Sequence, residues 1–177
     1  REVFTENKLP PYEITKRIEK AFGKQLIWIP CDPHEITDAQ QKGELPLCHA
    51  DGVLHPIDDE TILLSNYIDY DMDYRNQLLS RLMPYFNIKE LKFGNDRTDN
   101  SWIYINYLQV GEIVLMPVLN EPADRLAEKQ LHEHLGVNTI IPIDSRELTF
   151  DAEDGNVGGS LHCISWNVFD AEFKYNK

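Results

Sequence analysis

The chain has 177 residues, 42% of them hydrophobic, and carries 30 acidic against 17 basic side chains, which gives a formal net charge of -13. This size and apolar content favour one packed globular domain, and no stretch approaches the ~20 apolar residues of a membrane span. The negative charge repels phosphate backbones and anionic lipids, so we expect neither a nucleic-acid partner nor a membrane partner. A small cationic ligand suits this field.

The three cysteines, Cys31, Cys48 and Cys163, are irregularly spaced and fit neither a disulfide framework nor a zinc ribbon. Their odd number favours a reducing compartment, so we expect a cytoplasmic protein. A cysteine in an apolar context is usually inert filler, and we assign Cys31 and Cys48 no chemical role. The chain begins at Arg1 instead of Met, so we expect encoded residues upstream.

The first elements that the sequence predicts are a helix and a strand. Apolar residues recur at helical spacing over residues 10–22, and the apolar run 26–29 favours a buried strand. Residues 31–48 contain two prolines, a glycine and polar residues without a period, which predicts a long loop. Long loops inside a compact domain are often functional.

The middle of the chain predicts the order strand, strand, helix, strand twice. The first unit has its predicted strands and helix at 53–57, 61–65, 74–86 and 88–93. The second unit has them at 102–108, 113–118, 122–135 and 139–143. Pro122 in the first turn and Gly136 after the end support the helix of the second unit. Two such units in tandem indicate a repeat fold of the α/β class.

A third unit is expected to begin with a strand around Cys163, after two glycines that allow a close approach of the backbone. The opening helix and strand look like the end of an earlier unit, so about two and a half to three ββαβ units are expected. His49 and Asp51 lie near the start of the first unit, where alternation along a strand puts both on one face. The repeat predicts that these three side chains meet at a common centre.

The sequence around these residues resembles one enzyme family. Residues 158–165, Gly-Gly-Ser-Leu-His-Cys-Ile-Ser, resemble the signature around the nucleophile of agmatine deiminases and of their bacterial, Porphyromonas-type peptidylarginine deiminase relatives. Residues 48–52 and 58–63 are similar to the family's Gly-His-x-Asp block and to the Asp-(Asp/Glu)-x-Thr-(Val/Ile)-Leu segment that follows it. Residues 104–107 and 114–117 resemble the Tyr-x-Asn strand and the hydrophobic-Pro strand between those blocks. The resemblance covers essentially the whole chain.

The resemblance implies a pentein-type α/β propeller, in which five ββαβ units surround a central site. Residues 1–177 would then be the C-terminal portion of a single guanidine-modifying propeller domain, with its N-terminal units missing. Cys163 would be the nucleophile and His49 its acid/base partner. Asp51 and Asn106 would bind the substrate.

The reaction that the resemblance implies is hydrolysis of a guanidino group, or deimination, through a thiouronium intermediate on cysteine. Such hydrolysis benefits from a strong nucleophile, a carboxylate that holds the cation and a proton donor for ammonia. Agmatine, giving N-carbamoylputrescine and ammonia, is the favoured substrate. Conversion of arginyl residues to citrulline and a non-catalytic binding propeller are the alternatives. No metal or organic cofactor is implied, and a homo-oligomer is left open.

The chain departs from the family pattern at three places. Cys48 stands where a small residue is usual, His55-Pro56 replaces a common Arg-Phe pair, and the loop before His49 is longer. These departures concern the identity of the substrate more than the reaction class. The family's block with a second guanidinium-binding acid lies upstream of Arg1, so we expect residues 1–177 alone to be inactive.

Two other patterns point away from a metal site. His132 and His134 lie two residues apart on a predicted helix, where side chains diverge by about 200°. Asp69, Asp71 and Asp73 lack the glycine and the glutamate that complete a calcium loop. We interpret both patterns as solvated parts of helices.

Overall fold

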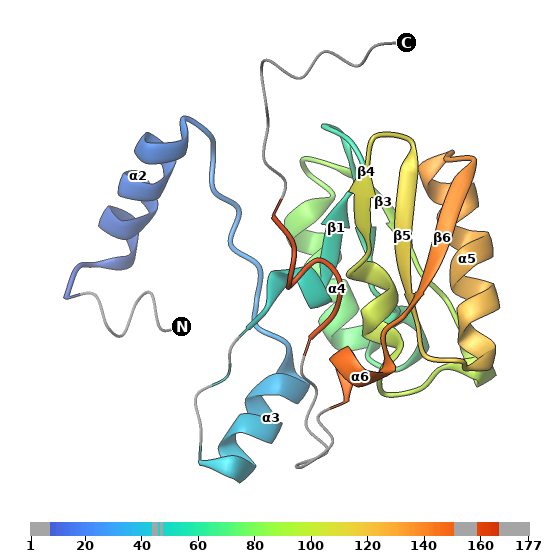
Figure 1. Cartoon of the computed structure of the whole chain (residues 1–177). Coiled ribbons are helices and arrows are strands. Elements are labelled where there is room, and N and C mark those ends of the chain that lie inside the picture. Colours follow the sequence, from blue (N-terminus) through green and yellow to red (C-terminus); the bar gives the residue numbers. More distant parts are fainter. Residues whose placement is uncertain (1–7, 44–45, 47, 151–158, 167–177) are drawn as a thin grey trace.

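Two three-stranded sheets, each with its own helix, form the main body of the protein (Figure 1). The computed structural model describes residues 8–43, 46, 48–150 and 159–166. The strands are β1 (Leu54–Pro56), β2 (Thr61–Leu64), β3 (Asn87–Glu90), β4 (Leu108–Val110), β5 (Ile113–Val118) and β6 (Thr139–Asp144). The α-helices are α2 (Pro11–Phe22), α3 (Pro33–Lys42), α4 (Met72–Leu82), α5 (Pro122–Leu135) and α6 (Arg146–Thr149).

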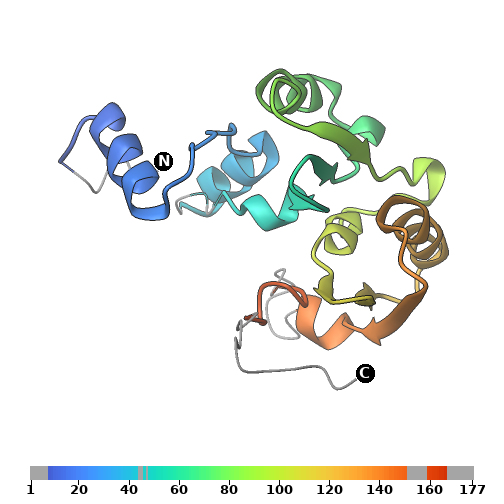
Figure 2. The ribbon, with the colours of Figure 1, turned by 90° about the horizontal axis from the view of Figure 1, so that it is seen from above.

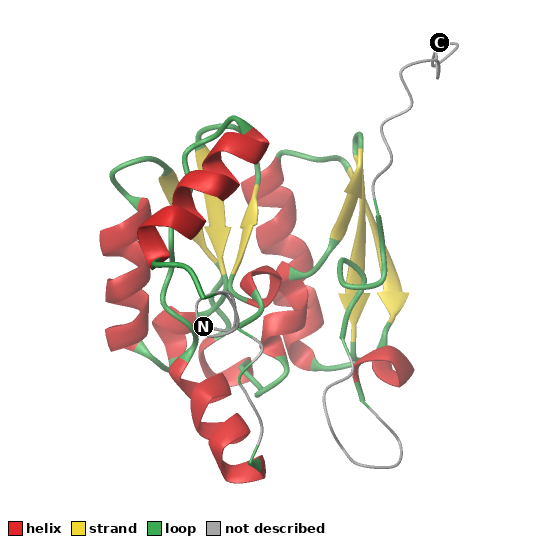
Figure 3. Ribbon diagram, turned by 90° about the vertical axis from the view of Figure 1, so that its left-hand side faces the viewer, coloured by secondary structure: helices red, strands yellow, loops and turns green. Residues whose placement is uncertain are grey.

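The two sheets have the same topology. In each sheet the first two strands pair antiparallel, and the second and third strands pair parallel. A parallel pair needs a crossover connection, which α4 supplies in the first unit and α5 in the second. The predicted α/β class and the tandem ββαβ order are therefore present. Figure 3 shows the sheets as separate groups of strands, and the described strands form no closed sheet.

The ends of α5 are set by local sequence. Pro122 occupies the first turn, and the side chains of Glu121 and Asp124 form a reciprocal capping box with backbone N–H groups. Gly136 ends the helix in the left-handed region at φ 64°. The helix predicted at residues 122–135 is confirmed at both ends.

Strand β2 is buried on both faces. Ile62 and Leu64 pack on one side in a cluster with α4, which contributes Tyr74, Leu78 and Leu82. Leu63 points to the opposite side, into a cluster with the second unit that includes Ala123, Ala127 and Leu131 of α5. Alternation along a strand explains this division of neighbouring residues. The two units are thus joined through apolar contacts on one face of the first sheet.

The expectations for the N-terminal part are partly wrong. The strand predicted at residues 26–29 does not form. Ile27 and Ile29 pack against the cluster between β2 and α4, but no described strand pairs with this segment. The predicted loop at 31–48 contains α3, which Asp32 caps and Gly43 ends. Only Ala39 of α3 is buried, so the sequence carries little helical periodicity there. Seen from above, α2 and α3 lie beyond the first unit, on the side away from the second (Figure 2).

The strands predicted to contain Asn106 and Cys163 are also partly wrong. Residues Ser101–Ile105 form a short 3₁₀ helix, and only Leu108–Val110 form the strand β4. Ile103 and Ile105 are both fully buried, and a short run that is buried on all sides fits a helical turn as well as a strand. Residues 161–164 form a turn instead of the opening strand of a third unit. No described helix is long and apolar enough to cross a membrane.

Candidate active site

Three of the candidate residues lie in contact although they come from distant parts of the chain. Asp51 belongs to a 3₁₀ turn, Ala50–Gly52, directly before the first unit's strands. Asn106 follows the 3₁₀ helix before β4, and Cys163 lies in the turn at 161–164. Asp51 Oδ2 is 3.3 Å and Asn106 Oδ1 is 3.4 Å from Cys163 Sγ. The strand face expected to present His49 with Asp51 is replaced by this turn.

Asn106 is fully buried and connects the other two residues. Its Nδ2 donates to the backbone oxygen of Asp51 at 3.2 Å and to Asp51 Oδ2 at 3.1 Å. Its Oδ1 accepts from the backbone N–H groups of His162, at 3.0 Å, and of Cys163, at 3.2 Å. Both ends of a buried amide are therefore satisfied, and one side chain fixes the carboxylate and the cysteine relative to each other.

Gly159 allows the chain to pass close to the cysteine. Its φ of 145° lies in a region that other residues rarely adopt. A Cβ atom at Gly159 would lie 3.6 Å from Cys163 Cβ and 3.9 Å from Cys163 Sγ. The close backbone approach predicted from the glycines before Cys163 is present at Gly159, whereas Gly158 lies outside the described residues.

The Asp51 carboxyl group is set up to be ionised. Burial raises its pKa, but hydrogen bonds from Cys163, Asn106 and His162 outweigh burial and lower the pKa below its usual value. An ionised carboxylate accepts hydrogen bonds with both oxygens, and its geometry matches the planar fork of a guanidinium group. Asp51 can therefore bind such a cation beside the sulfur atom.

The pKa of the Cys163 thiol is shifted in the opposite direction, towards the protonated form. Partial desolvation of the sulfur atom, together with the hydrogen bond to Asp51 and the charge of Asp51, raises the pKa of Cys163, although hydrogen bonds to Ser160 and Asn106 act against the rise. The thiol is thus protonated at neutral pH and donates to Asp51. A cation bound to Asp51 would offset the carboxylate charge and favour the reactive thiolate. Cys163 is exposed, so a ligand from solvent can reach it.

His49 lies apart from this group of contacts. It precedes the 3₁₀ turn and is exposed, and no hydrogen bond within the described residues joins its imidazole to Cys163. It acts instead on Glu35 of α3. Burial raises the pKa of Glu35 above its usual value, and the backbone N–H groups of Cys48 and His49 and the charge of His49 offset only part of this rise. Catalytic hydrogen bonds are often open without substrate, so the acid/base role of His49 stays a prediction.

Two further histidines belong to the site, and sequence reasoning assigned neither a role. His162 Nδ1 is 3.4 Å from Asp51 Oδ2, and its ring meets the ring of His55 edge-on at 5.5 Å. His55 stacks on Tyr107 at 4.1 Å. Burial, followed by the charge of His162, lowers the pKa of His55 to about 4, so this ring is neutral at pH 7. The signals in the sequence were the position of His162 beside Cys163 and the departure from the family pattern at His55.

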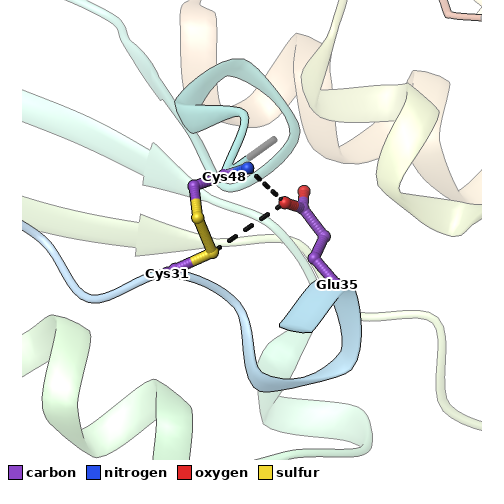
Figure 4. A group of neighbouring side chains, drawn as sticks. All are labelled: Cys31, Glu35 and Cys48. Carbon is purple, nitrogen blue, oxygen red and sulfur yellow. Dashed lines mark hydrogen bonds between the residues drawn. A yellow bond between two sulfur atoms is a disulfide. The ribbon is translucent and has the colours of Figure 1, made fainter. Parts of the chain in front are cut away.

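Cys31 and Cys48 form a disulfide, so the prediction that they are unpaired is wrong (Figure 4). Helix α3 folds between them and brings their Cα atoms to 5.0 Å, although they are 17 residues apart. Sequence spacing does not reveal this proximity. Because disulfides persist mainly in oxidising compartments, the reason given for a cytoplasmic location no longer holds, and location stays a prediction.

Glu35 lies beside the disulfide. Its Oε2 accepts from the backbone N–H of Cys48 at 2.6 Å and lies 4.0 Å from Cys31 Sγ. Cys31, Glu35 and Cys48 are the one cluster of metal-ligating side chains in the described part of the chain. Sulfur binds metals as thiolate, so the disulfide-bonded state of this cluster does not suit a metal ion.

Three solved structures with the same fold are agmatine or arginine deiminases by title. C. jejuni agmatine deiminase has a TM-score of 0.64 and 19% identity, over 92% of this chain and 48% of that one. The agmatine deiminase of Enterococcus faecalis has a TM-score of 0.66 and 16% identity, over 89% and 48%. A putative arginine deiminase from Porphyromonas gingivalis has a TM-score of 0.58 and 17% identity, over 91% and 49%.

The chain therefore spans about half the length of these structures. At such identities the likeness shows a shared fold. A search of curated proteins finds no match to the chain. The model of Porphyromonas-type peptidyl-arginine deiminase matches residues 7–168, which include Asp51, Asn106 and Cys163. The resemblance seen in the sequence is confirmed, and the chain belongs to the Porphyromonas-type peptidyl-arginine deiminase family.

Proposed function

We propose that the protein is a deiminase that hydrolyses the guanidino group of a small cationic substrate, with agmatine as that substrate. The observation that carries the proposal is the contact between the Asp51 carboxylate and Cys163 Sγ at 3.3 Å, with both residues held by Asn106. A carboxylate next to a thiol raises the thiol's pKa and so works against the nucleophile in the empty site. The arrangement becomes productive when a cation occupies the space between them.

In the proposed complex, Asp51 binds two guanidinium nitrogens in a bidentate pair. This pair places the central carbon beside Cys163 Sγ, and the bound charge stabilises the thiolate. Asn106 fixes both partners before the substrate arrives, which lowers the entropy cost of reaching the reactive geometry. Selectivity for a planar cation follows from the same pair of hydrogen bonds.

The chemistry proceeds in two halves. The Cys163 thiolate attacks the guanidinium carbon and forms an S–C bond; His49 then donates a proton to one nitrogen, the C–N bond breaks, and ammonia leaves. The product of this half is a thiouronium on Cys163. A water molecule then loses one proton to His49 and adds to the carbon. The S–C bond breaks to return the thiolate, and the remaining hydroxyl proton passes to solvent, where ammonia takes it up as ammonium. The second product carries a ureido group.

The two ββαβ units fit this proposal as neighbours in a larger propeller. Asp51 and Asn106 both lie directly before the first strand of their unit, so the repeat presents its functional residues at one end. Because the chain spans about half the length of the matched structures, we assign the closed ring and a second guanidinium-binding acid to the rest of the propeller. Residues 1–177 alone should then be inactive.

Agmatine and protein-bound arginine carry the same guanidinium group and differ at the opposite end of the substrate. Asp51 and Cys163 would treat the guanidinium of both alike. Two of the three structures compared above are agmatine deiminases by title, whereas the family model is named for peptidyl-arginine. We choose agmatine, whose short amine tail needs a smaller pocket than a polypeptide does.

The test is an assay of the full natural protein for ammonia and ureido product from agmatine, free arginine and arginyl peptides. Turnover of agmatine that disappears in Cys163→Ser is the expected result. Turnover of arginyl peptides alone would keep the reaction and replace the substrate. A folded protein that turns over none of the three would contradict the proposal and favour a propeller that only binds a partner.

A further inference from the structure

We propose that the Cys31–Cys48 disulfide, together with Glu35, is a positioning device that fixes the backbone at His49, so that breaking the disulfide slows the proposed reaction. The inference rests on the proposed function, because it assigns His49 the proton transfers. It goes beyond that function by giving a role to three residues outside the site: Cys31, Glu35 and Cys48 (Figure 4).

The backbone at Cys48 needs an external restraint. Its φ of 55° lies in the left-handed region, which residues other than glycine seldom adopt. The covalent bond to Cys31 and the 2.6 Å hydrogen bond from its N–H to Glu35 Oε2 both act on this residue, and its Sγ also lies 3.8 Å from the backbone oxygen of Pro46. Since His49 is the next residue, the direction in which the chain leaves Cys48 decides where the imidazole lies.

The other end of the restraint is anchored in the core. Cys31 is followed by Asp32, which is buried and caps α3 by accepting from the backbone N–H of His34 at 2.7 Å. The second carboxylate oxygen of Asp32 accepts from the Tyr67 hydroxyl at 2.6 Å, and Tyr67 is buried in the core cluster of the first unit. Glu35 lies on the same helix. The disulfide therefore ties Cys48 to a fixed part of the first unit.

Asp51 is anchored by Asn106, and no hydrogen bond within the described residues joins Asn106 to His49. Asn106 holds Asp51 through two hydrogen bonds, and Val53 after it is buried. His49 is exposed, and its backbone oxygen accepts from the N–H of Gly52 at 3.3 Å. On its N-terminal side it follows Cys48, which the disulfide restrains. Loss of the disulfide should therefore move His49 while Asp51 and Cys163 keep their contact. Proton transfer would suffer, and binding of the cation would persist.

The redox chemistry of the device is a simple exchange. A dithiol reductant gives two electrons and two protons to the Cys31–Cys48 bond, which becomes two thiols, and the reductant becomes a disulfide. Cys163 is a free thiol in both states. The site's nucleophile is thus unchanged by the reduction, and only the support of His49 is lost.

The test uses the full natural protein with both cysteines replaced, Cys31→Ser together with Cys48→Ser. We expect kcat to fall roughly tenfold or more, with KM changed by less than about threefold, because removal of a transition-state interaction lowers kcat alone. Asp51→Asn is the matched comparison and should raise KM. Peptide mapping should find Cys31 and Cys48 alkylated only after reduction.

Amide hydrogen exchange makes the test independent of turnover. In the double variant, exchange should rise at residues 48–50 and stay unchanged at 106 and 163. Failure of wild-type activity on every guanidine would sink the proposed function, whereas the exchange result would still decide whether the disulfide orders His49. Unchanged exchange at 48–50, a rise throughout the chain, or alkylation of both cysteines without reduction would each overturn the inference.

Discussion

At the scale of single residues, the site couples a carboxylate and a thiol that shift each other's pKa in opposite directions. The hydrogen bond between them lowers the pKa of Asp51 and raises that of Cys163. An empty site therefore keeps its nucleophile protonated. In the proposed reaction, a cationic substrate would remove this block by compensating the charge of Asp51, and binding would then also activate the nucleophile.

The first prediction concerns this coupling. In Asp51→Asn the pKa of the Cys163 thiol should fall, because the variant removes the negative charge that opposes thiolate formation. Alkylation by iodoacetamide follows the thiolate, so its rate should reach half of its maximum at a lower pH than in the wild type. Cys163→Ser identifies the signal. An unchanged midpoint would mean that Asp51 does not control the thiol.

A second prediction separates the two histidines nearest to the site in sequence. His49→Gln should lower kcat by about 10²- to 10⁴-fold, as expected for loss of a general acid/base. His162→Gln keeps the backbone hydrogen bonds to Asn106 and should lower kcat by less than about tenfold. Steady-state kinetics on agmatine measure both. The reverse order of effects would transfer the proton-transfer role to His162, whose ring lies 3.4 Å from Asp51.

At the scale of elements, the sequence predicted what periodicity and end signals determine. Helix α5 and strand β5 were placed correctly, because a helix flanked by Pro122 and Gly136 and an apolar run before it leave little choice. Residues 102–108 were assigned to a strand although the 3₁₀ helix takes up residues 101–105, since burial on all sides erases the period that separates strand from helix. Helix α3 was missed because it buries only Ala39, although its cap, Asp32, and Gly43 at its end are visible in the sequence.

The candidate site shows the same limit. Asp51, Asn106 and Cys163 could be selected because repeated units place equivalent positions together and the surrounding segments resemble a family. The Cys31–Cys48 pair could not be selected, because its proximity depends on how α3 folds back. Contacts that depend on tertiary packing, such as the stack of His55 on Tyr107, leave no local pattern in the chain.

At the scale of the whole molecule, the site lies where the two units meet. Leu63 of the first sheet packs into the core of the second unit, and Asn106 of the second unit holds Asp51 of the first. His55 on β1 and Tyr107 next to β4 add an aromatic stack across the same junction. The geometry of the site therefore depends on the packing of one unit against the other.

The neutral His55 ring makes this packing sensitive to acid. Its pKa is about 4 in the folded protein, against about 6.5 in an unfolded chain. Between these values the unfolded state binds more protons, so the contribution of His55 to stability is complete above pH 6.5 and is lost as the pH falls towards 4. By pH 4.5 the loss should be roughly 2–3 kcal/mol.

The last prediction tests this loss with His55→Gln. Urea unfolding of the full natural protein at pH 8 and pH 4.5 gives the free energy of unfolding at each pH. The variant lacks the stack on Tyr107 and should be less stable at pH 8, but its stability should fall by about 2–3 kcal/mol less than that of the wild type between the two pH values. The carboxylates that also titrate in this range are common to both proteins and cancel. Parallel losses in the two proteins would show that His55 charges freely in the folded state, and the junction between the units would then not be sensitive to acid through this residue.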